Sequence, residues 1–290
     1  MKIVFFGTPD FVLPIVEALH KEFNHGRERE FETIVTQAPK NTGRDHKLTY
    51  SAVDDWAFKH KFEIIRNIAD VPFADLGIVA AYGNIIPKSI IEKFSNGIIN
   101  IHPSLLPEFR GASPIQAALA SGKIQTGITF IKMDEQMDHG PIISQVKEEI
   151  LESDNNETLR TRLFESAAEV LIELIPNYLN GRIKLKEQDH DIATFTKLIK
   201  KEDGFVDLDF IKSALNGDRD ESTKILNLFR AYTPWPGVWT KIITKDEKEK
   251  ILKLTKINMN DGQLIIDEVQ IEGKNPVNFR QFKEGHPGII

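Results

Sequence analysis

Cysteine is absent from the 290 residues of this chain. Its absence excludes disulfides, thiolate ligands for zinc and a cysteine nucleophile, and it removes a common mark of secreted proteins. A metal site would have to be built from histidine and carboxylate side chains, and we expect none. Long apolar runs are missing too, because no stretch approaches the ~20 residues that a membrane span needs. The hydrophobic content of 41% is typical of a soluble globular protein with a sizeable core.

A targeting segment and a dinucleotide-binding motif are also missing. Residues 1–11, MKIVFFGTPDF, contain an apolar run that is too short for a signal peptide and has no small-residue cleavage site. They are typical of a core strand that enters a Gly-Thr-Pro turn. This turn has one glycine where a dinucleotide-binding loop has three, so we expect no dinucleotide site. We therefore expect a cytoplasmic protein without a membrane contact.

The formal net charge of −6 is unevenly distributed along the chain. Residues 200–290 carry equal numbers of basic and acidic side chains, so the acidic excess lies before them. Two patches are basic instead, residues 39–49 with Lys40, Arg44 and Lys47, and residues 182–201. Either patch alone is more often a solvated loop than a binding surface.

The first half of the chain alternates strand-like and helix-like segments. Strands are expected at residues 2–6, 32–36, 63–66, 76–81, 97–101 and 128–133, and helices at residues 11–23, 51–61, 87–94, 113–121 and 157–179. This alternation predicts an α/β domain with a parallel, Rossmann-like sheet covered by helices.

The last third of the chain has a different pattern. Gly181 ends the long helix, and a polar, lysine-rich linker follows over residues 182–201. A helix over residues 222–232 then precedes strand-like segments near residues 235–243, 251–257, 263–271 and 276–282. We therefore expect three parts: an α/β domain over residues 1–181, the basic linker, and a small β-barrel or sandwich over residues 202–290.

Two polar segments carry the chemistry. In the first, NIHPSLLPEFRGASPIQ at 100–116, Asn100 and His102 lie at the carboxyl end of a buried strand, where ligands of open α/β sheets bind. In the second, TGITFIKMDEQMDHGPII at 126–143, Asp138 follows a strand and begins a turn. The sequence thus predicts one pocket that holds Asn100, His102 and Asp138.

These three residue types suit acyl transfer to an amine. A nearby carboxylate holds an imidazole as imidazolium, which can donate to a developing oxyanion, and Asn100 adds an amide donor. Asp138 would take the proton of the amine, directly or through a water. No Gly-x-Ser-x-Gly nucleophile elbow is present, so direct attack by a bound amine is favoured. For a lone histidine the commoner role is to satisfy a main-chain carbonyl, and the neighbouring Asn100 and Asp138 argue against that role here.

Seven segments of the chain resemble the methionyl-tRNA formyltransferases, which belong to the formyltransferase family that uses 10-formyltetrahydrofolate as donor. The matching segments are residues 5–11, 36–44, 79–87, 100–116, 126–142, 193–208 and 229–240. The resemblance implies catalytic positions at Asn100, His102 and Asp138. It implies a folate-contacting segment of Ser104, Leu105, Leu106 and Pro107, and a pterin pocket lined by Tyr82, Gly83 and Met137.

The same resemblance implies an initiator methionyl-tRNA as acceptor. The loop with Lys40, Arg44 and Lys47 resembles the loop that enters the acceptor stem, and residues 229–237, FRAYTPWPG, begin an OB-like β-barrel domain. This chain departs from the family pattern within residues 37–44, and its second domain is shortened. A monomer is expected.

Three alternatives remain at this point. A sugar-nucleotide N-formyltransferase shares the catalytic core and has a different or reduced second domain. A formyltetrahydrofolate hydrolase uses water in place of the amine. A catalytically silent folate- or RNA-binding module would leave the three polar residues unused.

Overall fold

A computed structural model describes the chain except for residues 25–29, 43–46 and 245–246. The chain forms two compact units. The first unit comprises Met1–Gly111, Gln125–Glu149 and Arg160–Phe195, and the second comprises Ala112–Ile124, Ile150–Leu159 and Thr196–Ile290.

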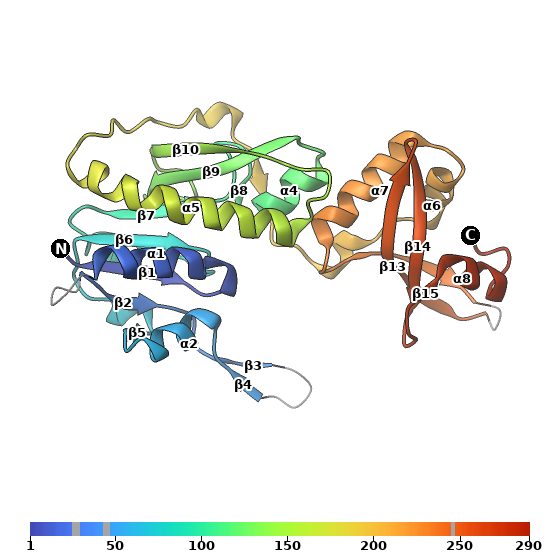
Figure 1. Cartoon of the computed structure of the whole chain (residues 1–290), viewed down its shortest axis with the longest axis horizontal. Coiled ribbons are helices and arrows are strands. Elements are labelled where there is room, and N and C mark those ends of the chain that lie inside the picture. The colour runs from blue at the N-terminus through green and yellow to red at the C-terminus, as the bar shows by residue number, and fades with distance from the viewer. Residues whose placement is uncertain (25–29, 43–46, 245–246) are drawn as a thin grey trace. The chain divides into compact units, whose positions relative to one another are not determined.

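A seven-stranded sheet forms the centre of the first unit (Figure 1). Its strands are β1 (Ile3–Gly7), β2 (Phe31–Val35), β5 (Glu63–Ile65), β6 (Leu76–Ala80), β7 (Ile98–His102), β9 (Gln125–Lys132) and β10 (Ile142–Glu149), in the order β10-β9-β7-β6-β1-β2-β5. The strands from β5 to β7 are parallel, while β9 and β10 pair antiparallel at one edge. Every residue of β1 and β6 is buried, as expected for strands covered on both faces. The predicted α/β architecture is confirmed, with β10 as a strand that the sequence analysis did not include.

Helices connect these strands close to where the sequence predicts them. They are α1 (Leu13–Phe23), preceded by the 3-10 turn η1 (Asp10–Val12), then α2 (Ala52–Lys59), η2 (Ile68–Asp70), α3 (Lys88–Ile91), α4 (Pro114–Ala120) and α5 (Asn156–Leu179). Helix α3 is shorter than the predicted 87–94. None of the helices among the described residues has both the length and the apolar character of a membrane span.

Two short strand pairs add to the first unit. Strands β3 (Lys40–Thr42) and β4 (Lys47–Thr49) pair antiparallel at the base of the basic loop. Strand β8 (Arg110–Gly111) pairs with β11 (Phe195–Thr196), which follows the 3-10 turn η3 (His190–Ile192). Residues 182–195, expected as a linker, are therefore part of the first compact unit.

The main sheet of the second unit is an antiparallel meander. After η4 (Lys201–Gly204), α6 (Leu208–Leu215) and α7 (Arg219–Tyr232), the chain forms β12 (Val238–Ile243), β13 (Glu249–Asn260), β14 (Gln263–Ile271), β15 (Val277–Asn278) and α8 (Phe279–Gly285). The strands lie in the order β12-β13-β14-β15. Asp261 and Gly262 both have positive φ, 48° and 79°, which is the backbone of the tight hairpin turn between β13 and β14.

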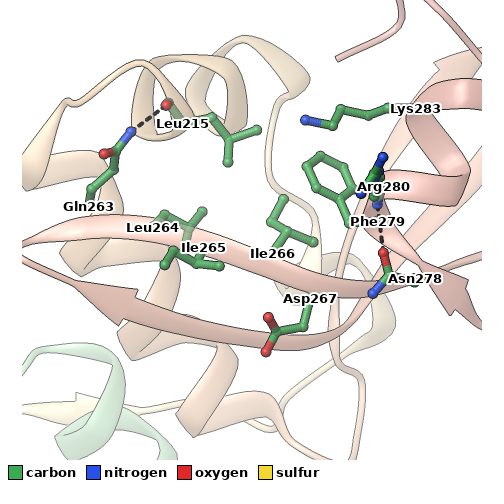
Figure 2. A pocket seen from close by; sticks show the side chains of 10 residues that line it. All are labelled: Leu215, Gln263, Leu264, Ile265, Ile266, Asp267, Asn278, Phe279, Arg280 and Lys283. Atoms are coloured by element: carbon green, nitrogen blue, oxygen red, sulfur yellow. Dashed lines mark hydrogen bonds between the residues drawn. The ribbon is translucent and has the colours of Figure 1, made fainter.

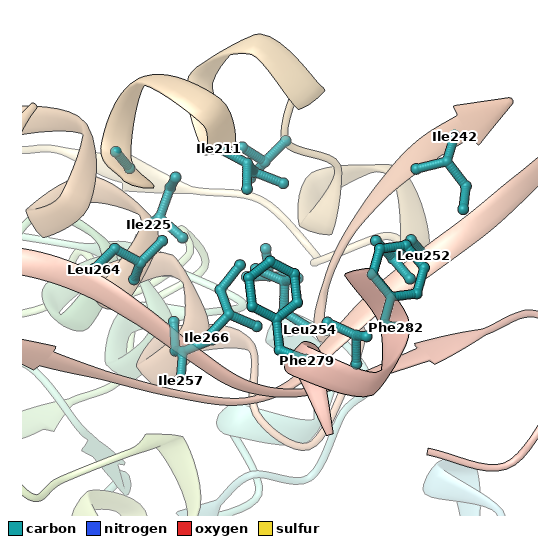
Figure 3. Packing of buried hydrophobic residues seen from close by; sticks show 14 of the residues in the cluster. Ile211, Ile225, Ile242, Leu252, Leu254, Ile257, Leu264, Ile266, Phe279 and Phe282 are labelled. Carbon is teal, nitrogen blue, oxygen red and sulfur yellow. The ribbon is translucent and has the colours of Figure 1, made fainter. Parts of the chain in front are cut away.

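One hydrophobic cluster joins this meander to its helices (Figure 3). Ile211 of α6 and Ile225 of α7 pack with Leu254 of β13, and Phe279 and Phe282 of α8 belong to the same cluster. Of the strand expected over residues 276–282 only β15 forms, and the expectation is wrong from Phe279 onward, where the chain forms α8. Asn278 accepts from the amide of Arg280 and so caps this helix.

Candidate active site

Strand β7 places Asn100 and His102 on the same side of the sheet. Side chains two residues apart in a strand point to the same face, and both residues lie at the carboxyl end of β7, just before Pro103. Asn100 pairs with Ile131 of β9, and His102 pairs with Thr129. The two side chains therefore start from a rigid, central strand.

Asp138 reaches these side chains from the loop between β9 and β10. Its carboxylate oxygen Oδ1 accepts from Asn100 Nδ2 at 3.1 Å, and Oδ2 accepts from the amide of Gly111 at 2.8 Å. The backbone of Asp138 has a positive φ of 50°, a conformation that aspartate tolerates better than most residues. The structure thus brings together the three polar residues that the sequence predicts in one pocket.

His102 is oriented by contacts at both ring nitrogens. Nε2 lies 3.0 Å from the carbonyl oxygen of Phe109, and because a carbonyl only accepts, Nε2 carries the hydrogen. Nδ1 lies 3.5 Å from Asp138 Oδ1, and the two side chains are 5% and 11% exposed. A hydrogen bond from Nδ1 to the carboxylate would require a second proton on the ring, at Nδ1, which makes the ring an imidazolium. The histidine satisfies a main-chain carbonyl and also faces the carboxylate.

Two buried residues that the sequence analysis did not select complete this region. Arg110 is 3% exposed, and its Nε and Nη2 atoms donate to Oε1 of Gln188, which is 5% exposed, at 3.1 and 2.6 Å. Burial lowers the pKa of the Arg110 guanidinium, and the negative charges of Asp138 and Asp134 act in the opposite direction. The only sequence signal for Arg110 was its place within the 100–116 segment, and Gln188 lay in a region read as a linker.

The main chain of the predicted folate segment, residues 104–107, is held by hydrogen bonds from polar side chains of β9 and β10. Thr129 Oγ1 donates to the carbonyl of Ser104 and accepts from the amide of Leu106, at 2.6 and 3.0 Å. Gln145 Nε2 donates to the carbonyl of Leu106 at 2.8 Å. Ser104 and Leu106 are buried, while Leu105 and Pro107 are partly exposed. Leu105 and Pro107 are therefore the side chains of this segment that a ligand can reach.

The residues expected around the pterin pocket differ in exposure. The Tyr82 ring is buried and packs edge-on against Phe6. The carbonyl of Tyr82 accepts from Thr8 Oγ1 and from Gln37 Nε2, both at 3.0 Å. Gly83 has a positive φ of 80° and is exposed.

Met137, on the loop that carries Asp138, is 64% exposed. Its expected place in the pterin pocket, with Tyr82 and Gly83, stays a prediction.

The basic loop is described only at its base. Lys40 and Lys47 lie on β3 and β4, and both are exposed. Lys40 Nζ donates to Gln37 Oε1 at 2.7 Å, so this residue links the hairpin to the turn at Tyr82 through Gln37. Arg44 lies outside the described residues.

A separate hollow lies in the second unit, over β14 and α8 (Figure 2). It has a volume of about 400 Å³, and Gln263, Ile265, Phe279 and Lys283 are among its lining residues. None of the predicted site residues lines it. Within the described residues, no group of three or more His, Asp or Glu side chains is arranged to hold a metal ion.

The family of this chain follows from comparisons with known proteins. Residues 1–175 match the model of the formyl transferase family, and residues 198–287 match that of the formyl transferase C-terminal domain. A methionyl-tRNA formyltransferase of Caldicellulosiruptor saccharolyticus is 34% identical over 324 residues, which cover 99% of this chain and 97% of that protein. A methionyl-tRNA formyltransferase of Sulfurihydrogenibium sp. is 32% identical, with the same coverage of 99% and 97%.

Solved structures share the fold. An N-formyltransferase from Helicobacter canadensis, in complex with folinic acid and dTDP-3-aminofucose, superposes with a TM-score of 0.63 at 15% identity, covering 93% of this chain and 95% of that chain. A methionyl-tRNA formyltransferase from Clostridium thermocellum superposes with a TM-score of 0.58 at 22% identity, covering 93% and 98%. The sequence matches span both halves of the chain, so the chain belongs to the formyl transferase family.

Proposed function

We propose that the protein transfers a formyl group from 10-formyltetrahydrofolate to the α-amine of methionine on initiator tRNA. The observation that carries this proposal is the convergence of Asn100 and His102 on one carboxylate oxygen of Asp138, in a chain that is similar over 99% of its length to methionyl-tRNA formyltransferases. In this arrangement the carboxylate can accept the proton of an amine, and the two side chains beside it can donate to an oxyanion.

The proposed reaction begins when the neutral amine attacks the formyl carbon. The carbonyl oxygen becomes an oxyanion, which accepts from the Asn100 amide and from His102 Nδ1–H. The 3.5 Å separation between Nδ1 and Asp138 leaves this hydrogen only loosely held by the carboxylate. Asp138 takes one proton from the attacking nitrogen. When the bond from the formyl carbon to N10 breaks, that proton passes to N10, so the products are the formylated amine and tetrahydrofolate.

The donor is proposed to lie against the surface formed by Gly83, Leu105 and Met137. The exposed Met137 side chain and the partly exposed Leu105 side chain provide apolar contact for the pterin ring. Ser104 and Leu106 act through the main chain, because their carbonyls and the Leu106 amide are held by Thr129 and Gln145, while Pro107 adds its partly exposed ring. Tyr82 contributes its main chain next to Gly83.

The acceptor tRNA is proposed to meet the basic loop at Lys40, Arg44 and Lys47. Ammonium and guanidinium groups pair with backbone phosphates, which positions a nucleic acid without reading its sequence. The exposed Lys40 and Lys47 at the base of the hairpin support this role.

The test offers the purified protein 10-formyltetrahydrofolate with each candidate acceptor. We expect formylated methionyl-tRNA as the product, detected by mass spectrometry after nuclease digestion. Turnover on an amino-sugar nucleotide without formylation of methionyl-tRNA would transfer the assignment to a sugar-nucleotide formyltransferase. Release of formate from the donor alone, without any formylated acceptor, would indicate a hydrolase.

The domain division is a further part of the proposal. We infer a catalytic domain over residues 1–181 and a small domain over residues 202–290, joined by the basic segment 182–201, of which residues 182–195 pack with the first unit, and we infer that the protein acts as a cytoplasmic monomer. The cluster of Figure 3 supports the small domain, because all of its members follow residue 205. Size-exclusion chromatography with light scattering tests the monomer, which has a mass of 33.0 kDa.

A further inference from the structure

We propose that Gln188, anchored by Arg110, is a positioning residue that fixes the main chain around Asp138 for the formyl transfer. The inference rests on the function proposed above and adds a residue from the segment that follows the long helix α5. Gln188 is a positioning residue because it contacts the loop of Asp138 and not the reacting atoms.

The contacts of the Gln188 amide use its donor and acceptor sides separately. Nε2 donates to the carbonyl of Asp138 at 2.9 Å and to the carbonyl of Gly140 at 2.7 Å. Oε1 accepts twice from Arg110. A primary amide has two hydrogens and one oxygen, so these contacts occupy both hydrogens and both lone pairs. The orientation of the amide is therefore fully determined by its neighbours.

Arg110 is held in the middle of the same site. Its neighbour Phe109 accepts from His102, and its other neighbour Gly111 donates to the carboxylate of Asp138. The amide of Arg110 donates to the carbonyl of Thr194 at 2.8 Å. A short segment of three residues thus touches His102, Asp138 and, through its buried guanidinium, Gln188. A movement of Gln188 would therefore shift the main chain that contacts His102 and Asp138.

The loop of Asp138 needs such support. The positive φ of Asp138 is a backbone conformation that costs energy in a residue with a side chain. Gly140 lies so close to the carbonyl of Lys132 that no side chain fits there. The two carbonyls held by Gln188 lie on either side of His139, so the loop is pinned at two points. A displacement of ~1 Å at a reacting group can lower turnover about 100-fold.

The decisive variants are Gln188→Glu and Gln188→Met. Glutamate keeps an acceptor for Arg110 but cannot donate to the two carbonyls, and methionine fills a similar volume without either contact. We expect both to lower kcat by about 10- to 100-fold, with KM for the donor changed less than about twofold. Gln270→Glu is the matched control, because Gln270 also donates to a main-chain carbonyl, that of Lys274, and lies on β14. We expect this control to have wild-type kinetics.

Wild-type turnover of Gln188→Glu would overturn the proposal, because it would mean that the residue serves only as a hydrogen-bond acceptor for Arg110. Gln188→Asn, which withdraws the amide by one methylene, gives the same test if another variant fails to fold.

A second measurement is independent of the reaction. The hydrogen bond of the Gly111 amide ends on Asp138 Oδ2, so its hydrogen exchange reports the position of that carboxylate. We expect Gln188→Glu to speed exchange at Gly111 by at least about tenfold, with no change at Ile78 in the centre of β6. Unchanged exchange at Gly111 would contradict the positioning role. If wild type fails to formylate methionyl-tRNA, the proposed function is wrong while this exchange test still decides the role of Gln188.

Discussion

Asp138 concentrates the interactions of the site in a single side chain. Its two carboxylate oxygens contact Asn100, His102 and the amide of Gly111, and its carbonyl is held by Gln188. Replacing the carboxylate by an amide retains the shape of the residue but removes the proton acceptor. Substitution of this single residue therefore tests the chemistry most directly.

For Asp138→Asn we expect a fall in turnover of roughly two to four decades, the size expected for a lost acid-base group. His102→Ala should fall within the same range because an oxyanion donor is removed. Single-turnover formylation measures both, and thermal melting checks that folding is retained. Asp261→Asn, in the turn between β13 and β14, is the control for the chemical change and should be fully active. Near-normal turnover in both site variants would rule out the proposed mechanism.

A substitution of Leu105 tests the proposed binding surface for the formyl donor. Leu105→Asp would place a charge against an apolar ring, so we expect weaker binding of tetrahydrofolate by at least about tenfold. Calorimetric titration measures the affinity, and the ligand-induced rise in Tm gives a second reading. Leu198→Asp introduces the same change at an exposed leucine and should leave the affinity unchanged. Equal affinity in wild type and Leu105→Asp would place the donor elsewhere.

At the scale of elements, the strands and helices of the first unit follow from local pattern. Continuous apolar runs predict β1 and β6, because strands buried on both faces have no polar side, and an apolar run also leads into β7. The end of β7 could also be predicted, since Pro103 follows it, and the polar residues there were assigned to one pocket. These features depend only on neighbours in the sequence.

The features that the sequence analysis missed depend partly on contacts distant in the chain and partly on a local signal that was overlooked. Strand β10 begins with two buried isoleucines and then alternates partly buried and exposed residues, and it pairs with β9. Helix α8 has Asn278 as its cap and Phe279 and Phe282 at helical spacing, a signal that a strand-like reading of residues 276–282 overlooked. Gln188 is a single buried amide in a polar segment, and no periodicity can indicate such a residue.

Helix α2 provides a test of an element boundary. Ser51 Oγ accepts from the amide of Asp54 at 3.1 Å and lies 2.9 Å from the hydroxyl of the fully buried Thr36. Ser51→Ala removes the helix cap and leaves Thr36 without this partner, so we expect a loss of about 1–2 kcal/mol in the free energy of unfolding. Ser51→Thr keeps the hydroxyl and should lose less. Urea denaturation compares the three proteins, and an unchanged midpoint for Ser51→Ala would show that the cap has no energetic role.

For the whole molecule, the balance of charge determines how a tRNA can bind. The chain carries a net charge of −6, so attraction to phosphates must come from local basic groups. We expect binding of methionyl-tRNA to weaken steeply with salt, and Lys47→Gln to reduce the slope of log K against log salt by roughly one phosphate contact. Arg44→Ala should raise KM for methionyl-tRNA without changing the affinity for the donor. Both variants are measured at several salt concentrations.

Lys59→Gln, at the exposed end of α2, is the control for the loss of one positive charge. We expect this control to have the wild-type slope and KM, and if Lys47→Gln and Arg44→Ala also have them, the basic loop does not contact the tRNA. A sugar nucleotide as acceptor would give a much shallower slope, because it carries too few phosphates.

The segment over residues 186–196 can be regarded as a tethered intramolecular ligand. Lys186 exchanges backbone hydrogen bonds with Ile142, Gln188 holds the Asp138 loop, and Thr194 pairs with the main chain of Pro107 and Arg110. The covalent tether from α5 keeps the effective concentration of this segment high, so its docking costs little entropy. Cutting the chain between Gly181 and Lys186 would turn that docking into a bimolecular equilibrium, and the catalytic carboxylate would then be in place only while the segment is bound.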